Sequence, residues 1–136
     1  FPTRRSSDLV RNSDIICTTT PSTTPVLPDD KELLRGKCII AIGSYMPEMR
    51  EIPDAVLDLV DNVYIELPYA CEESGDLSQP LASGKLTKDR VKLMHEYLVS
   101  GEKEIKEGQT TYFKSVGMGL FDVCIAQKLY EVAKEK

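Results

Sequence analysis

The chain of 136 residues is 41% hydrophobic and 29% charged, which is ordinary for one globular domain and too apolar for a disordered one. Its formal charge of −5 argues against nucleic acid or an anionic membrane as a partner, because both surfaces require clustered Lys and Arg. Every apolar run is far shorter than the roughly 20 residues that a membrane-spanning helix needs. We therefore expect a soluble protein with one packed domain.

The first nine residues differ from the rest of the chain. Residues 1–9, FPTRRSSDL, have no amphipathic period and no initiator Met, and they lack the pattern of a signal or transit peptide. They resemble the translation of a sequencing adapter joined to a truncated gene. We expect residues 1–9 to be non-native and the genuine sequence to begin near Val10, so the fold prediction leaves these nine residues out.

From Val10 onward, strand-like and helix-like segments alternate. Short β-branched or apolar runs predict strands at 14–20, 38–42, 63–66 and 110–114. Caps and helical periodicity predict helices at 29–35, 53–60, 88–99 and 119–134. Asp29 or Asp30 is expected to cap the first of these helices, and Gly36 to end it. This alternation predicts an α/β fold with a mostly parallel sheet.

The segment 119–134 is the clearest helix of the chain. Phe121, Ile125, Leu129 and Val132 recur at spacings of four, four and three residues. These side chains form an apolar stripe along one side of the helix. We expect this helix to pack outside the sheet.

Four cysteines are present, at positions 17, 38, 71 and 124, and none forms a CxxC pair. Zinc sites usually have a close ligand pair, and small disulfide-bonded proteins carry more cysteine, so neither is expected and no metal is assigned. Three of the four lie in apolar segments, where we expect them to pack as small core residues. Free cysteines of this kind indicate a reducing, cytoplasmic compartment.

Three strand exits carry the candidate site. Parallel α/β sheets bind ligands at the carboxyl ends of their strands. The exits rich in small or polar residues are Thr18 to Ser22, Gly43 to Pro47, and Lys114 to Gly119. Composition and periodicity alone leave a nucleotide-binding fold without a stated reaction, because a fold does not fix chemistry.

Five segments carry a resemblance to a known family. They are DIICTTTPS at 14–22, PVL at 25–27, AIGSYMPEMREI at 41–52, EESGDL at 72–77 and TTYFKSVGMGLFD at 110–122. In this order and spacing they resemble the ornithine cyclodeaminase/mu-crystallin family, over essentially everything after Leu9. The resemblance implies a Rossmann domain inserted into a substrate-binding and dimerisation domain, NAD or NADP as cofactor, a small imino- or amino-acid substrate, and a homodimer.

The resemblance also implies that this chain lacks parts of the family's cofactor site. A Rossmann site needs a glycine-rich turn after its first strand to hold the pyrophosphate, and this chain contains no GxGxxG. We therefore expect the C-terminal part of a larger enzyme that is inactive by itself. Residues 10–118 are expected to form a partial Rossmann domain, and residues 119–136 a helix of the substrate and dimerisation domain.

The resemblance assigns ligand contacts to residues at the strand exits. Cofactor contacts fall on Thr18, Thr20, Ile42, Gly43, Ser44 and Ser115. Substrate contacts fall on Tyr45 and Val116. Each has a plainer explanation: the threonines fill a strand, the glycine ends a turn, and Ser115 caps the final helix. No residue is assigned as catalytic.

One departure from the family pattern bears on the reaction. Cyclodeaminases have an aspartate two residues after the glycine that Gly43 matches, and here that position is Tyr45. A phenol, whose ordinary pKa is about 10, is a poor base at neutral pH. The sequence therefore favours imine reduction or amino-acid dehydrogenation, with Tyr45 touching substrate, donating a proton or only packing. The alternatives are an ornithine cyclodeaminase, which is an ammonia lyase, and a non-catalytic NADPH- or ligand-binding crystallin-like protein.

Other polar residues receive structural interpretations. His95, in the predicted helix 88–99, is expected at the surface. Glu72, Glu73 and Asp76 are expected to cap and solubilise a helix end with Gly75 as its stop, which we prefer to a cation site.

Overall fold

A parallel sheet of five short strands forms the centre of the molecule. The structure is a computed structural model that describes residues 6–100 and 106–135. Within these residues the strands are β1 (Ile15–Thr18), β2 (Cys38–Ala41), β3 (Val63–Ile65), β4 (Val91–Leu93) and β5 (Thr111–Lys114). Their order across the sheet is β1-β2-β5-β3-β4, and every pair is parallel. The predicted parallel α/β class is confirmed.

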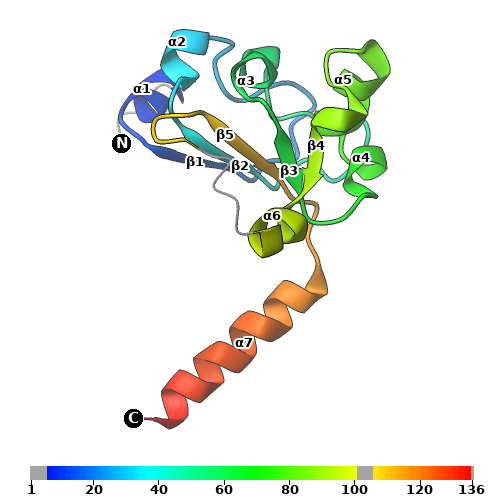
Figure 1. Ribbon diagram of the computed structural model, residues 1–136. Helices are drawn as coiled ribbons and strands as arrows, with labels where there is room; N and C mark the ends of the chain where they lie inside the picture. The colour runs from blue at the N-terminus through cyan, green and yellow to red at the C-terminus, as the bar shows by residue number, and fades with distance from the viewer. Residues whose placement is uncertain (1–5, 101–105, 136) are drawn as a thin grey trace.

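Short helices connect the strands. They are α1 (Ser6–Arg11), α2 (Lys31–Leu34), α3 (Asp54–Leu59), α4 (Ala70–Glu73), α5 (Gly75–Ser83), a 3₁₀ turn (Lys88–Arg90), α6 (Met94–Ser100) and α7 (Gly119–Lys134). Helices α1, α2, α3 and α5 lie on one side of the sheet and α6 on the other (Figure 1). No helix in the described ranges is long and apolar enough to cross a membrane.

The caps predicted for the first helix are present. The Asp30 carboxylate accepts hydrogen bonds from the N–H groups of Glu32 and Leu33, as an N-cap does. Gly36 follows the helix with φ +72°, a conformation that favours glycine. The local sequence was sufficient to place this helix.

The two faces of the sheet are covered unequally. Strand residues alternate, so Ile16 and Ile39 are buried under the helices, whereas Ile15 on the opposite face is 66% exposed. Cys17 shares that open face and is exposed. The expectation that cysteines in apolar segments pack as core residues is wrong here, since Cys124 is exposed as well and Cys38, like Cys71, is only partly buried.

The predicted helix at 88–99 is wrong. A 3₁₀ turn and strand β4 occupy its first half, and only Met94–Ser100 is helical. Val91 and Leu93 alternate with Lys92, and they pair in register with Val63 and Ile65 of β3. Pairing with a neighbouring strand thus overrides the local helical preference.

A helix end was expected at Gly75, and α4 does end just before it, with Ser74 as C-cap. A second helix, α5, which was not expected, begins at Gly75 itself, and Ser74 Oγ caps it by accepting from the Asp76 N–H. A Cβ on Gly75 would lie 2.1 Å from the Met49 carbonyl oxygen, so this position needs glycine for close approach. Asp76 is 1% exposed, so the interpretation of this residue as solubilising is wrong.

Residues 6–9, which the fold prediction left out, belong to helix α1. Val10 in the same helix is 3% exposed and part of the core. Residues 1–5 lie outside the described residues. The adapter origin of residues 1–9 stays a prediction.

Helix α7 leaves the body of the molecule and contacts none of its core (Figure 1). Its bounds, Gly119–Lys134, are those that the sequence predicted. No residue of α7 is buried, and exposed large apolar side chains occur along it: Leu120, Phe121, Val123, Ile125, Leu129, Tyr130 and Val132. The expectation that this helix lies outside the sheet is confirmed, and its assignment to another domain stays a prediction.

Candidate functional site

The three strand exits that the sequence singled out meet at one edge of the sheet. Strands β1, β2 and β5 are parallel neighbours, so their carboxyl ends lie together. The Ile42 N–H donates to the Thr18 carbonyl oxygen at 2.9 Å, and the Ser115 N–H to that of Ala41 at 2.9 Å. The pairing therefore continues just past the strand ends.

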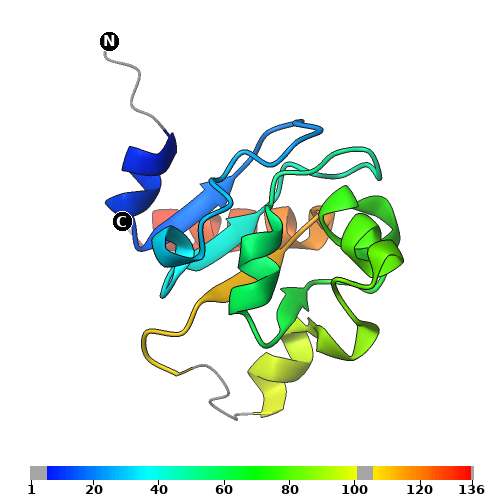
Figure 2. The same ribbon diagram turned by 90° about the horizontal axis from the view of Figure 1, so that it is seen from above.

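Beyond this edge, the loops that follow β1 and β2 run side by side, as Figure 2 shows from above. The Arg50 N–H donates to the Ser22 carbonyl oxygen at 2.7 Å, and the Val26 N–H to that of Glu51 at 2.8 Å. The two loops are therefore fastened together along their length and not only at the strands.

The Glu51 carboxylate also joins these two loops, because it accepts hydrogen bonds from both of them. Its side chain is fully buried. Oε2 accepts from the Thr18 hydroxyl and the Gly43 N–H, each at 2.8 Å. Oε1 accepts from the Thr20 N–H at 2.5 Å and the Thr20 hydroxyl at 2.8 Å. Four donors from two loops thus converge on one carboxylate.

These hydrogen bonds give the two threonines of the β1 exit a structural role. The hydroxyls of Thr18 and Thr20 donate to Glu51 and do not simply fill the strand. The sequence analysis missed Glu51, because its partners lie 31 and 33 residues away and no local periodicity links them. An acidic residue between Arg50 and the apolar Ile52 was the only available signal.

Gly43 is required by the approach of the two loops. A Cβ at this position would lie 2.2 Å from the Thr20 backbone nitrogen and 2.3 Å from its carbonyl oxygen. Any side chain would therefore force the loops apart. The family resemblance assigned Gly43 a cofactor contact, and in the structure the group that lies closest to its Cα is the backbone of Thr20.

Ser44 and Asp76 extend the buried network. Ser44 is 0% exposed, and its hydroxyl donates to the Met49 carbonyl oxygen and pairs with Ser74 Oγ, both at 2.8 Å. Asp76 Oδ1 accepts from the N–H groups of Glu51, at 2.7 Å, and of Ile52, at 2.9 Å. The Ser44 side chain is thus turned inward, and the whole residue is closed to solvent.

A buried lysine completes this network. Lys114 is fully buried and its Nζ lies 3.8 Å from Asp76 Oδ2. Nζ also donates to the carbonyl oxygens of Ala41, at 3.3 Å, and Ser115, at 3.0 Å. Burial raises the pKa of Asp76 and lowers the pKa of Lys114, since both charged forms lose water, and each charge partly offsets the shift of the other.

A second carboxylate, Glu66 at the end of β3, holds the β5 exit. Its Oε1 accepts from the Ser115 hydroxyl at 2.9 Å and from the N–H groups of Val116, at 2.6 Å, and Gly117, at 3.1 Å. Ser115 therefore does not cap the last helix, whose N-cap is Met118 without a side-chain bond. Oε2 of Glu66 is buried and has no partner among the described residues.

The remaining predicted residues face outward. Tyr45 is 53% exposed and Ile42 is 41% exposed, whereas Val116 is partly buried against the core. His95 is exposed, in keeping with its predicted surface position. No cluster of potential metal ligands occurs in the ranges 6–100 and 106–135.

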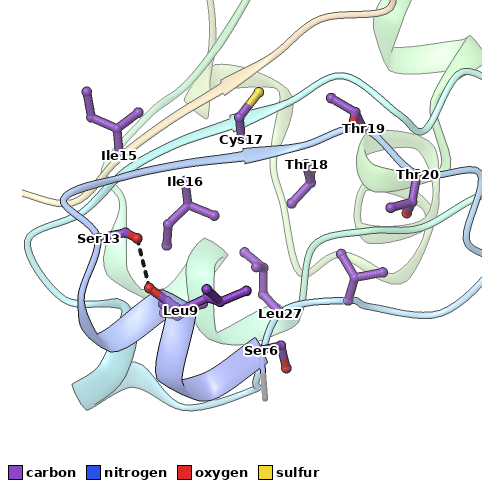
Figure 3. A pocket seen from close by; sticks show the side chains of 12 residues that line it. Ser6, Leu9, Ser13, Ile15, Ile16, Cys17, Thr18, Thr19, Thr20 and Leu27 are labelled. Carbon is purple, nitrogen blue, oxygen red and sulfur yellow. Dashed lines mark hydrogen bonds between the residues drawn. The ribbon is translucent and has the colours of Figure 1, made fainter. Parts of the chain in front are cut away.

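A cavity of about 400 Å³ opens along β1, next to the predicted cofactor residues (Figure 3). Consecutive residues from Ser13 to Thr20, except Asp14, line it, although alternate side chains of a strand point to opposite faces. The opposite wall comes from α1 and from Val26 and Leu27. The cavity therefore follows the outer edge of β1, which within the described residues has a partner strand on one side only.

A parallel α/β sheet with fastened loops at its carboxyl edge is the architecture of the nucleotide-binding α/β proteins. The model of the ornithine cyclodeaminase/mu-crystallin family matches residues 3–136, and the chain belongs to that family. The match begins inside the segment 1–9 that the fold prediction left out.

Relatives and solved structures agree with this assignment. The Delta(1)-pyrroline-2-carboxylate reductase of Bacillus cereus (strain ATCC 10987 / NRS 248) is 35% identical over 134 residues, which are 96% of this chain and 41% of that protein. The structure of a probable ornithine cyclodeaminase from Bordetella pertussis Tohama I matches at 30% identity with a TM-score of 0.77, over 98% of this chain and 43% of that one.

A third match is to the Thermococcus litoralis Delta(1)-pyrroline-2-carboxylate reductase, solved in complex with NADH and L-proline. The TM-score is 0.78 at 23% identity, over 98% of this chain and 42% of that chain, which shows the shared fold. The chain spans about two fifths of the length of the curated relatives that it matches.

Proposed function

We propose that this chain contributes part of the NAD(P) site of an oxidoreductase that reduces a small imino acid, such as a ketimine or pyrroline-2-carboxylate, or interconverts an amino acid and its keto acid. The observation that carries the proposal is the set of three strand-exit loops fastened at one edge by Glu51 and Glu66. A rigid edge of this kind is suited to hold a planar cofactor ring in one orientation.

The residues at this edge fit such a cofactor through their backbones. The Glu51 and Glu66 carboxylates are covered by N–H and hydroxyl donors, so little negative charge faces an anionic ligand. Ile42 is exposed and Gly43 is partly exposed, and neither has a polar side chain, whereas Ser44 is buried and supports the loop from inside. We propose that the cofactor is NAD or NADP and lies against these residues, against Thr18 and Thr20, and against the loop at Ser115.

Substrate contacts are proposed for Tyr45 and Val116. Tyr45 is exposed at the β2 exit and Val116 lies at the β5 exit, on neighbouring strands. When bound, the nicotinamide supplies or accepts a hydride. The residues of this chain orient the ring and the substrate beside each other, and none of them is assigned as the catalytic acid.

The domain assignment is part of the same proposal. Residues 10–118 form part of a Rossmann domain, in which the free edge of β1 and its cavity receive a further strand. Residues 119–136 belong to the substrate and dimerisation domain, where the apolar side chains of α7 find their partner in a homodimer. The exposed apolar residues of α7 support this assignment.

Imine reduction is proposed over ornithine cyclisation because of Tyr45. Its phenol stands where cyclodeaminases of this family have an aspartate, and the two carboxylates that hold the strand exits, Glu51 and Glu66, are buried. The reductase relative from Bacillus cereus supports the same choice.

The test is an assay of the full-length protein that includes this chain. We expect oxidation of NADH or NADPH, followed by absorbance, with pyrroline-2-carboxylate or with pyruvate plus ammonia. Ammonia release from ornithine should be absent, and Tyr45→Asp should restore at most a trace of it. Tight cofactor binding without turnover of any imino acid would instead support a crystallin-like binding protein, and ornithine deamination at a matching rate would reverse the choice.

The chain alone is expected to bind NAD(P)H weakly and to be inactive. The reason is the lack of a GxGxxG turn, whose N–H groups hold the pyrophosphate in Rossmann sites. Isothermal titration of residues 10–136 with NAD(P)H measures this affinity directly. A micromolar affinity would contradict the proposal that part of the cofactor site lies outside this chain.

A further inference from the structure

We propose that Glu51 is a positioning residue of the cofactor site, which sets the spacing of the β1 and β2 exit loops without touching the ligand. This inference rests on the proposed function and deepens it. The family resemblance drew attention to residues that face the edge, whereas Glu51 lies beneath them.

The first argument is that Glu51 connects segments that are far apart in the sequence. It joins Thr18 and Thr20, which lie 33 and 31 residues away, to Gly43, which lies eight residues away. The loops also approach so closely at Gly43 that no Cβ fits there. The carboxylate therefore closes the narrowest point between the two loops.

The second argument is that Glu51 is itself fixed. Its N–H donates to Asp76 Oδ1, and its carbonyl oxygen accepts from the Val26 N–H. The other oxygen of Asp76 faces the buried ammonium of Lys114. These contacts hold the backbone of Glu51 in place, so its side chain starts from a fixed position and sets where the loops lie.

The third argument is that the chemistry requires a carboxylate. Each oxygen accepts from a backbone N–H, Oε1 from that of Thr20 and Oε2 from that of Gly43. The threonine hydroxyls can rotate, but a backbone N–H cannot become an acceptor. In Glu51→Gln, either orientation of the amide brings its NH₂ against one of these N–H groups, so one loop loses its attachment.

The experiment compares Glu51→Gln with the unmodified full-length protein. The KM for NAD(P)H should rise about tenfold or more, as expected for the loss of a hydrogen bond to a charged acceptor. The kcat at saturating cofactor and the KM for the imino acid should change less than about twofold, because the edge still forms once the cofactor is bound. The proposal would be overturned if the KM for NAD(P)H, the kcat and the KM for the imino acid all worsened equally, or if none of them changed.

A matched control is Asp58→Asn, another replacement of a carboxylate by an amide. Asp58 pairs with Lys31 and Lys85 at the surface, away from the three loops. Its cofactor KM should stay that of the unmodified protein. A similar rise in both variants would show a general effect of removing carboxylates and would also overturn the proposal.

A second variant covers the case in which Glu51→Gln does not fold. Thr18→Val keeps the shape of the side chain and removes one bond to Oε2. The Thr18 hydroxyl is already bonded to Glu51 and the residue is 5% exposed, so the proposed contact of Thr18 with the cofactor is made by its backbone, which the variant keeps. Its cofactor KM should rise about threefold, because one neutral donor is lost, and no change would count against positioning. An unmodified protein that binds no nicotinamide nucleotide would defeat the proposed function and this inference together.

Discussion

The body of the molecule packs its apolar side chains against one another, whereas helix α7 leaves its apolar side chains exposed. The body buries an apolar core and also a connected set of charged groups, Glu51, Asp76 and Lys114. Helix α7 carries seven exposed large apolar residues and buries none. A well-formed helix therefore says little about stability unless its packing partner is also present.

Of the changes that test this comparison, Asp76→Asn is expected to have the largest effect on the free energy of unfolding. The new amide places its NH₂ either against the buried Lys114 ammonium or against the N–H groups of Glu51 and Ile52, so a buried donor loses its acceptor and the free energy of unfolding should fall by about 1–3 kcal/mol. The double variant Asp76→Asn with Lys114→Met should regain much of that loss, because no unpaired charge remains. Urea denaturation measures both, and additive losses would mean that the two groups do not interact.

The same pair should make stability depend on pH. Because burial raises the pKa of Asp76, the folded state holds its proton more tightly than the unfolded state does. The stabilising contribution of the protonated acid is present at low pH and is lost as pH rises from 3.8 through the raised pKa of the folded state. We expect the stability of the unmodified chain relative to the double variant to fall over that range in urea titrations. A flat difference would contradict the raised pKa of Asp76.

A smaller gain is expected from Tyr112→Phe in the body. Tyr112 is fully buried, and its hydroxyl has no hydrogen-bond partner among the residues that the structure describes. Removing an unpaired buried hydroxyl should stabilise the fold by about 1 kcal/mol. Thermal unfolding checks this, and a loss of stability would reveal an unrecognised partner.

The smallest effect on stability is expected in α7. Ile125→Gln with Leu129→Gln changes two exposed side chains and should leave the free energy of unfolding within about 0.5 kcal/mol. Self-association of residues 10–136 should nevertheless decrease, and residues 10–117 should be more soluble. Size-exclusion chromatography provides the measurement. A stable monomer of residues 10–136 that is weakened by these changes would show that α7 docks on the body.

The sequence was sufficient to predict the structural features that depend on residues close together in the chain. The bounds of α7 and the end of α2 at Gly36 follow from periodicity and caps, and the three site loops follow from strand ends. Strand β4 was missed because only pairing with β3 makes Val91 and Leu93 a strand.

The predicted site residues lie at one edge, but the groups that hold them could not be found in advance. Ser44 and Ser115 were expected to contact the cofactor, and in the structure both hydroxyls bond within the protein. Their partners come from other strands and helices, so no local pattern signals them. Glu51 and Glu66 look like ordinary acidic residues until the chain is folded.

The position of β5 has a consequence for how the chain is made. It is the last strand in the sequence, yet it lies between β2 and β3 and is the only link between the pairs β1-β2 and β3-β4 in the described sheet. Until Thr111–Lys114 leaves the ribosome, the nascent chain holds two separate strand pairs with open edges. Such edges are the sites at which chains aggregate, and contacts distant in sequence form slowly. We therefore expect chaperone protection of the nascent chain to matter until β5 has emerged and joined the two pairs.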